Sequence, residues 1–267
     1  MKRIAKTISG LAMIMSVLAL NTSCIEVRRI KASGNYITKN IEVPDFNSIK
    51  VQGSEDILFS QSTDGKTSVK VYASDNIVDL LDIRVDDETL IVKHKNNFSI
   101  FGFGDNGNVK VIVSSPNIYG ASVQGSGDIL FKTIIKTDKL DLYVQGSGDI
   151  NGTGIICNEL HSTVQGSGDI AIKGIKCQNI EAGIQGSGDI LYEGEANSVT
   201  LKTQGSGDIN AANLKGMEVY ATTQGSGSIS CFAIHDLKAK IQGSGDVSYK
   251  GNPRVDYENN NKLHKMN

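Results

Sequence analysis

The sequence is poor in the residues that build large cores, metal sites and redox centres. Its 267 residues include no Trp, three Pro, four Cys and four His, and aromatic residues make up 6% of the chain. The His residues show no metal-ligand spacing, and no two Cys form a CxxC pair. The net charge of -2 is far from the basic balance of nucleic-acid-binding domains. We therefore expect a thin aliphatic core, no metal site, no cofactor and no nucleic-acid partner.

Glycine, in contrast, is abundant, and much of it lies in one repeated motif. The stretch VQGSGDI occurs at 123–129, 144–150 and 164–170, and near-copies occur at 184–190, 203–209, 223–229 and 241–247. Successive motif Gln residues lie 18 to 21 residues apart, a period typical of solenoids. A catalytic loop is written once, so this motif predicts architecture before chemistry.

Apolar residues recur at fixed distances from the motif Gln. Before it they alternate with polar residues, as in Leu140, Leu142 and Val144, which is typical of a strand with one buried face. Five residues after it they form a nearly pure column: Ile129, Ile150, Ile170, Ile190, Ile209, Ile229 and Val247. About ten residues after it they form another: Ile134, Ile155, Ile175, Leu214 and Ile234. This pattern predicts an all-β, single-stranded, right-handed parallel β-helix of about 20-residue coils over residues 119–250.

The motif itself is interpreted as the corner of each coil. Its two glycines suit a corner that needs positive φ and that leaves no room for side chains between coils. One such structural corner comprises Gln145, Gly146, Ser147, Gly148 and Asp149. The stacked Gln side chains are expected to form an amide ladder.

The motif carboxylates form a column of like charges, interrupted by Ser228: Asp128, Asp149, Asp169, Asp189 and Asp208. Neighbours about 4.8 Å apart repel by about 3.5 kcal/mol at an effective dielectric constant of 20. We expect each Asp to cap its own turn by accepting backbone N–H bonds. The alternative is that the column binds calcium, since the motif has a faint likeness to a calcium-binding glycine–aspartate repeat of different period.

The segments outside the repeats predict an exported chain. Residues 1–23 read as a signal peptide, with the basic MKRIAK, the apolar LAMIMSVLAL and the small residues NTS before Cys24. This segment resembles a relaxed Bacteroidetes lipoprotein signal, which implies lipid on Cys24 and a membrane contact through that lipid. We expect 24–45 to be a tether, 46–118 an irregular β-rich cap and 251–267 a polar tail that covers the last coil or is disordered.

Within the predicted cap, three local features are recognisable. FNSIKVQGSEDILFS at 46–60 is an imperfect copy of the repeat, with Glu55 where a Gly belongs. DDET predicts a hairpin turn, and SDNIVDLL predicts a helical turn capped by Ser74 or Asp75.

Cys157 and Cys177 each follow their motif Gln by 12 residues, so we expect them to stack in neighbouring coils. They are interpreted as small apolar residues of the core, with a disulfide as the alternative.

These features together resemble one known family. F..I.VQGS.DI, LDIRVDDETLIVKHK, VKVIVSSPNIYGASVQGSGDI and the serial GSGDI copies are similar to the "putative auto-transporter adhesin head GIN domain" family, over residues 45–250. The resemblance implies an exported, often lipid-anchored β-helix of Bacteroidetes, at the cell surface or the periplasmic face of the outer membrane. It implies no catalytic or binding residues.

The function expected from the sequence is therefore binding without catalysis. No nucleophile motif such as G-x-S-x-G is present, and most acids recur in register, unlike the non-repeated acids of β-helical polysaccharide enzymes. We expect a lipid-tethered module that binds a glycan or a protein. The alternatives are a structural or regulatory envelope component and, less favoured, a polysaccharide-active enzyme.

Overall fold

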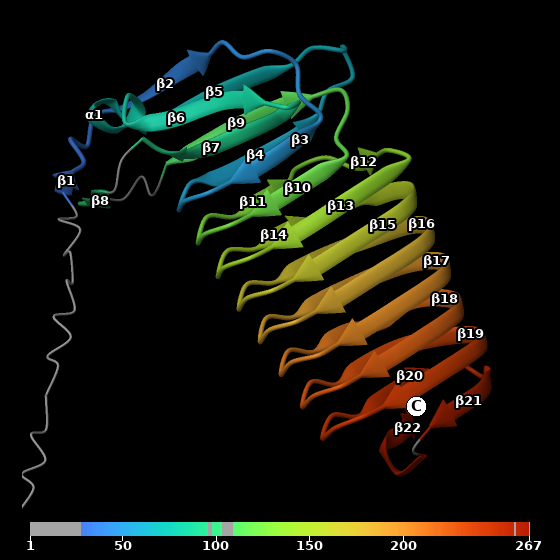
Figure 1. The fold of residues 1–267 in the computed structure, drawn as a ribbon. Coiled ribbons are helices and arrows are strands. Elements are labelled where there is room, and N and C mark those ends of the chain that lie inside the picture. Colours follow the sequence, from blue (N-terminus) through green and yellow to red (C-terminus); the bar gives the residue numbers. More distant parts are fainter. Residues whose placement is uncertain (1–27, 96–97, 103–108, 259, 267) are drawn as a thin grey trace, which may run out of the picture.

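The chain folds into a stack of coils with an irregular cap at the N-terminal end (Figure 1). The computed structural model describes residues 28–95, 98–102, 109–258 and 260–266. The predicted signal peptide and Cys24 lie outside the described residues.

In the regular part of the stack, one long strand follows most of one coil. Each of these strands pairs in parallel with the next, residue for residue, with local shifts at bends. The strands are β15 (Ile155–Val164), β16 (Ile170–Ile184), β17 (Ile190–Thr203), β18 (Ile209–Thr223) and β19 (Ile229–Ile241). The predicted all-β fold of stacked β-helix coils is confirmed.

Each coil has three straight sides, which the burial pattern of β16 makes visible. Buried and exposed residues alternate along β16 except at two places, where two successive residues are exposed and the chain bends. We call Ile170–Ile172 the first side, Ile175–Cys177 the second side and Ile180–Ile184 the third side, and we use these names for equivalent residues in other coils. The motif at 185–189 then closes the coil.

The earlier coils use shorter strands along the same sides. They pair in parallel with their neighbours, for example Ala121 with Leu142 and Ile129 with Ile150. The strands are β10 (Gly120–Val123), β11 (Ile129–Phe131), β12 (Ile135–Lys136), β13 (Lys139–Val144) and β14 (Ile150–Gly152).

The predicted core columns lie inside the stack, with two corrections. The column from Ile129 to Val247 is 0–1% exposed throughout, and Ile155, Ile175 and Leu214 are equally buried. Ile134, however, is 53% exposed and Ile135 takes the inward position, while Ile234 is half-buried. The coil of Ile134 has one residue more than a 20-residue coil and that of Ile234 two fewer, so a fixed count from the Gln misses the inward residue.

The motif glycines are required by the close approach of successive corners. A Cβ atom on any second-copy or later motif glycine would lie 2.0–2.3 Å from a backbone oxygen of the preceding coil. The predicted positive φ is found only at Gly146 and Gly243 among the motif glycines described. Steric exclusion between coils, and not backbone conformation, is therefore the general reason for glycine.

The backbone of each corner also bonds to the preceding corner. The N–H groups of Ser167 and Gly168 both donate to the carbonyl oxygen of Gly146, at 2.8 and 3.1 Å. The same pair of bonds recurs at every corner from Ser126 to Gly245. Only a residue without a Cβ allows this approach, so the glycines and the corner hydrogen bonds depend on each other.

The N-terminal part continues the stack and then covers it. β3 and β4 form the imperfect first copy, which pairs in parallel with β10 and β11 on one side and with β7 and β9 on the other. Antiparallel strands β2, β5 and β6 complete the cap, and β1 pairs with β8. The bounds are β1 (Arg28–Lys31), β2 (Tyr36–Ile41), β3 (Ser48–Val51), β4 (Asp56–Gln61), β5 (Ser68–Ser74), α1 (Asp75–Val78), β6 (Leu81–Asp86), β7 (Thr89–His94), β8 (Phe98–Phe101) and β9 (Lys110–Ser115).

Both local predictions within the cap are confirmed, one with a correction. β6 and β7 form the hairpin, with Asp87 and Glu88 at φ 46° and 55° in its turn. The helical turn is α1, but the Ser74 side chain makes no capping hydrogen bond. Asp75 accepts instead from the Asn76 N–H at 2.7 Å.

Glu55 stands where later copies have the second glycine. Its side chain occupies space that a preceding corner occupies in later coils. Its carboxylate is buried, with Oε1 2.5 Å from His94 Nε2. Oε2 would lie 2.3 Å from a Cβ on Gly53, and in later coils the preceding carbonyl oxygen occupies that place. A side chain is tolerated here because no motif corner precedes this one.

The segments predicted as tether and tail contain ordered strands. Residues 36–41 pair antiparallel with β5, so they belong to the cap. At the other end, β20 (Val247–Lys250) and β21 (Arg254–Glu258) stack on β19, and β22 (Leu263–Lys265) stacks on β20 after a short 3-10 helix, η2 (Asn260–Lys262).

We predict that two Gly→Ala substitutions, one in the corner before β16 and one within β16, have opposite effects. Gly168→Ala places a Cβ 2.1 Å from the Gly148 oxygen, a backbone atom that cannot move aside. It should lower the free energy of unfolding by at least about 3 kcal/mol or prevent folding.

The matched control is Gly183→Ala on the outer face of β16. Its Cβ would meet only the Lys202 oxygen, at 4.0 Å. Because alanine restricts the unfolded chain, stability should rise by about 0.4–1 kcal/mol. Urea unfolding of both variants measures the difference, and equal stability of the two would contradict the steric account.

Candidate functional site

Two surfaces of the stack are candidates for function: the corner column of Gln and Asp, which the sequence singled out, and a groove along the second side, which it did not. The Gln side chains of the corners form part of the predicted amide ladder. Nε2 to Oε1 distances are 3.1 Å for Gln52–Gln124, 3.2 Å for Gln165–Gln185 and 2.8 Å for Gln204–Gln224. Tyr143 joins the ladder by donating its hydroxyl to Gln165 Oε1 at 2.5 Å.

The Asp side chains connect coils, and the prediction that each caps its own turn is wrong. Asp169 Oδ1 accepts from the backbone N–H of Asp189, one coil further on, at 2.7 Å. The same bond links each of Asp56, Asp128, Asp149, Asp189 and Asp208 to the next coil, at 2.7–3.2 Å. Bonds from N–H to an ionised carboxylate offset the repulsion within the column.

Ser228 fits this arrangement although it carries no charge. Its Oγ accepts from the Asp246 N–H at 3.2 Å, so the serine keeps the bond to the next coil. At the N-terminal end of the column, burial raises the pKa of Asp56. Within the described ranges, no three His, Cys, Asp or Glu side chains are arranged to hold a metal ion.

We predict that the column stabilises the stack without calcium. Asp169→Ser should lower the free energy of unfolding by about 1 kcal/mol, because a neutral acceptor replaces a charged one, as at Ser228. The melting temperature of the wild type should be the same in calcium and in chelator. A calcium-dependent rise in the wild type that shrinks in Asp169→Ser would overturn the hydrogen-bond account and restore calcium binding.

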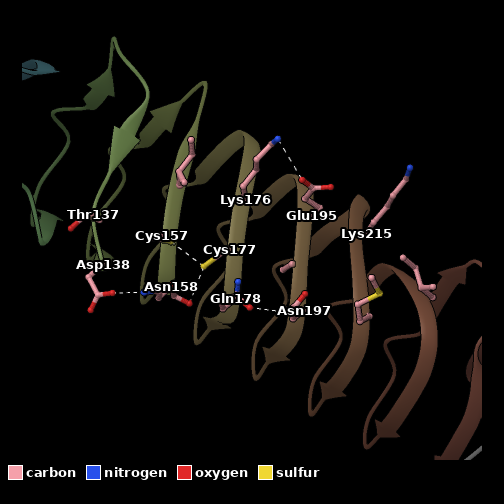
Figure 2. Close-up of a pocket in the computed structure, with 14 residues that line it drawn as sticks. Thr137, Asp138, Cys157, Asn158, Lys176, Cys177, Gln178, Glu195, Asn197 and Lys215 are labelled. Carbon is pink, nitrogen blue, oxygen red and sulfur yellow. Dashed lines mark hydrogen bonds and ion pairs between the residues drawn. The ribbon is translucent and has the colours of Figure 1, made fainter.

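The second surface is a groove of about 640 Å³ that crosses several coils (Figure 2). It lies along the second side and its bend into the third side. Three kinds of side chain line it: amides at this bend, a row of alternating charges, and apolar side chains.

Amide side chains at the bend between the second and third sides form one wall of the groove. Asn158 Nδ2 donates to Asp138 Oδ1, and Asn197 Nδ2 donates to Gln178 Oε1 (Figure 2). These ladders leave further amide donors and acceptors directed at solvent, since each amide group has more bonding positions than one partner fills. This wall can therefore hydrogen-bond an extended ligand at intervals of one coil.

The outward residues of the second side supply charge and apolar contact. Lys176, Glu195 and Lys215 follow one another in successive coils, with Lys176 Nζ 3.6 Å from Glu195 Oε1. Ile156, which is 40% exposed, precedes Lys176 in this row, and Met217, which is 41% exposed, lies at the bend two residues after Lys215. The groove therefore offers apolar anchors on either side of a mixed-charge centre.

The floor of the groove is made of small inward residues. Cys157, Cys177 and Ala196 belong to one inward column and remain 8%, 8% and 6% exposed. The predicted stacking of the two Cys in neighbouring coils is confirmed, and their sulfur atoms lie 3.0 Å apart.

Sequence reasoning missed the groove because its lining residues do not repeat. The outward positions of the second side hold Ile156, Lys176, Glu195 and Lys215, which share no chemistry. The one signal in the sequence was the run of small inward residues on this side, which form the floor of the groove. The other predicted site residue, Cys24, lies outside the described residues.

No helix within the described parts of the chain combines the length and apolar character needed to cross a membrane. No functionally curated protein is detectably similar to the chain.

Solved structures with this architecture are known from Bacteroidetes. A protein from Parabacteroides distasonis, described as a putative lipid binding protein, is 26% identical, with a TM-score of 0.82 over 90% of this chain and 100% of its own. A putative adhesin from Bacteroides fragilis is 31% identical, with a TM-score of 0.67 over 88% of this chain and 95% of its own. A putative adhesin from Parabacteroides merdae shares the fold at 23% identity, with a TM-score of 0.80 over 90% and 100%.

The family resemblance that the repeats suggested is also found directly. A model of the family described as "Putative auto-transporter adhesin, head GIN domain" matches residues 45–174 and 155–253, which include the first imperfect copy and every later corner. The chain belongs to this adhesin-like head GIN family.

Proposed function

We propose that the protein is a lipid-anchored, non-catalytic binding module of the bacterial cell envelope. The family is adhesin-like, and the similar structures named above are described as putative adhesins or as a putative lipid binding protein. The groove along the second side is the observation that carries the proposal. Its amide wall, charged row and apolar ends form a continuous surface across several coils.

The chemistry of the groove favours a protein segment over a glycan as the ligand. Sugar rings commonly stack on aromatic side chains, and the lining residues include none. An extended polypeptide presents backbone amides and side chains of alternating character, which suit the amide wall and the apolar ends. A lipid, suggested by the description of the Parabacteroides distasonis protein, fits less well because Lys176, Glu195 and Lys215 occupy the centre.

Anchoring at Cys24 would present the coils at a membrane surface. The cap is the part of the fold nearest to Cys24 in sequence. The stack then extends away from the cap toward β22 (Figure 1). The groove lies along the stack and stays accessible in this arrangement. Attachment to the outer membrane, at either its surface or its periplasmic face, is part of the proposal.

We predict that Cys24→Ala changes the partitioning of the exported protein. The wild type should enter the detergent phase of a phase-separation extract of cells, because a lipid on Cys24 anchors it. The variant should appear in the aqueous phase. Equal partitioning of both proteins would remove the lipid anchor from the proposal but leave the binding role untouched.

We also predict that Ile156→Lys weakens ligand binding. The substitution places a charge at one apolar end of the groove and should weaken binding at least about tenfold. Binding is measured on an array of matrix proteins, in glycosylated and enzymatically deglycosylated forms, and of their released glycans. Retained binding to the deglycosylated form indicates a protein ligand, and binding only to glycans would reverse the preference stated above.

The matched control is Ile112→Lys on β9. Ile112 is 42% exposed, close to the 40% of Ile156, but it lies in the N-terminal cap. This variant should bind as the wild type does. If both variants bind equally well, the groove is not the binding surface.

A further inference from the structure

We propose that Cys157 and Cys177 form a disulfide that joins two successive coils in the exported protein. The inference goes beyond the binding role, because it concerns a covalent modification of the groove floor. Three observations carry it: the register of the two residues, the distance between their sulfur atoms, and their access to solvent.

The register already places the two residues as a disulfide requires. Cys157 and Cys177 are direct partners in the parallel pairing of β15 and β16. Directly paired residues of neighbouring strands lie about 4.8 Å apart, within the Cα–Cα range of about 4.4–6.8 Å found in disulfides. The spacing of the two Cα atoms is therefore compatible with a disulfide.

The side chains are also turned toward each other. The two Sγ atoms lie 3.0 Å apart, so a movement of about 1 Å reaches the bonded distance of about 2.05 Å. Figure 2 shows the contact at the bend where the groove is lined by Asn158 and Gln178. Each Cys remains 8% exposed toward this groove, so a small thiol oxidant has a path to the pair.

The environment makes one of the two thiols the better nucleophile. The hydrogen bond shared with Cys157, followed by neighbouring backbone groups, lowers the pKa of Cys177. The same shared bond and burial raise the pKa of Cys157. The thiolate is the reactive form, so Cys177 is expected to react first.

The oxidation balances with a disulfide-bearing oxidant R–S–S–R of the cell envelope. The Cys177 thiolate attacks one sulfur, forms a mixed disulfide and releases one R–S⁻. Cys157 then loses its proton and attacks the Cys177 sulfur, which forms the Cys157–Cys177 bond and releases the second R–S⁻. Two electrons pass to the oxidant, and the two protons of the cysteines go to the released thiolates.

The bond would close a loop of one coil and limit how far the chain can open there. It joins β15 covalently to the longer strand β16. On its other edge, β15 pairs with the two short strands β12 and β13. Cross-links of this kind stabilise mainly by restricting the unfolded chain. The floor of the groove would then be held at a fixed width across two coils.

The test is a peptide map of the full-length protein taken from the cell envelope, with thiols trapped by acid and alkylation during lysis. Without reduction, trypsin should release the peptide 140–173 cross-linked to the peptide 177–202. Cys231 serves as an internal control, because burial raises its pKa to about 12 and it should be recovered as a free thiol after denaturation. Recovery of Cys157 and Cys177 as alkylated thiols from envelope protein would overturn the proposal.

Thermal melts give a second readout. Reduction should lower the melting temperature of the wild type by about 4–16 °C. The double variant Cys157→Ala, Cys177→Ala should melt near the reduced wild type, with or without reductant, and it should fold because Ala196 occupies the same column. A wild type whose melting temperature is insensitive to reductant would contradict a cross-link. Cell fractionation shows export independently, so a failure of export is distinguishable from a failure of the disulfide.

Discussion

The structure depends on the contact between successive corners, where the backbone of one coil lies directly on the backbone of the last. Two N–H groups of each corner meet one carbonyl oxygen of the preceding corner, and the Asp N–H meets the preceding Asp carboxylate. All these donors point toward the N-terminal end of the stack and all the acceptors toward the C-terminal end. The glycines are the condition for this contact, because a Cβ would lie within 2.3 Å of the acceptor.

A ladder with one direction lacks a neighbouring corner at each of its two ends, and a side chain that occurs once fills the vacant place at each. At the N-terminal end, where acceptors are missing, the Glu55 carboxylate occupies the place of the absent carbonyl oxygen. At the C-terminal end, where donors are missing, Lys262 Nζ donates to the Gly243 oxygen at 2.6 Å. His264 Nε2 lies 3.8 Å from Asp246 Oδ1 beside it. The C-terminal end resembles a helix C-terminus, where a cation meets carbonyl oxygens that lack a backbone donor.

The repeats were predictable from the sequence, and the ends and the groove were not, for one physical reason. A residue that recurs in register reports a condition that every coil must meet, such as the inward position of Ile170 or the missing Cβ of Gly168. Glu55 and Lys262 meet structural requirements that exist only at the ends of the stack, so no repeat in the sequence predicts them. Differences in coil length also defeat a prediction from the repeat. One additional residue in the coil places Ile135, and not Ile134, in the core.

The direction of the Asp bonds was missed for a related reason. A single copy of GSGD suggests a turn that caps itself, because side chains of Asp commonly bond to nearby backbone. In the stack, the carboxylate accepts instead from the N–H of the next coil, as the 2.7 Å bond from the Asp189 N–H to Asp169 Oδ1 shows. Stacking therefore converts a local preference into a contact between coils.

This division between repeated and unrepeated residues also separates scaffold from function. The corner and the core column are committed to stacking, so most substitutions there lower the stability of the stack. The outward positions of the second side are free of that condition, and they hold Ile156, Lys176, Glu195 and Lys215. Because the scaffold fixes the spacing of these positions but not their identity, the same stack can present different surfaces by substitution at one column. A binding surface is therefore expected where the repeat breaks down in sequence but not in structure, and the groove along the second side is such a place.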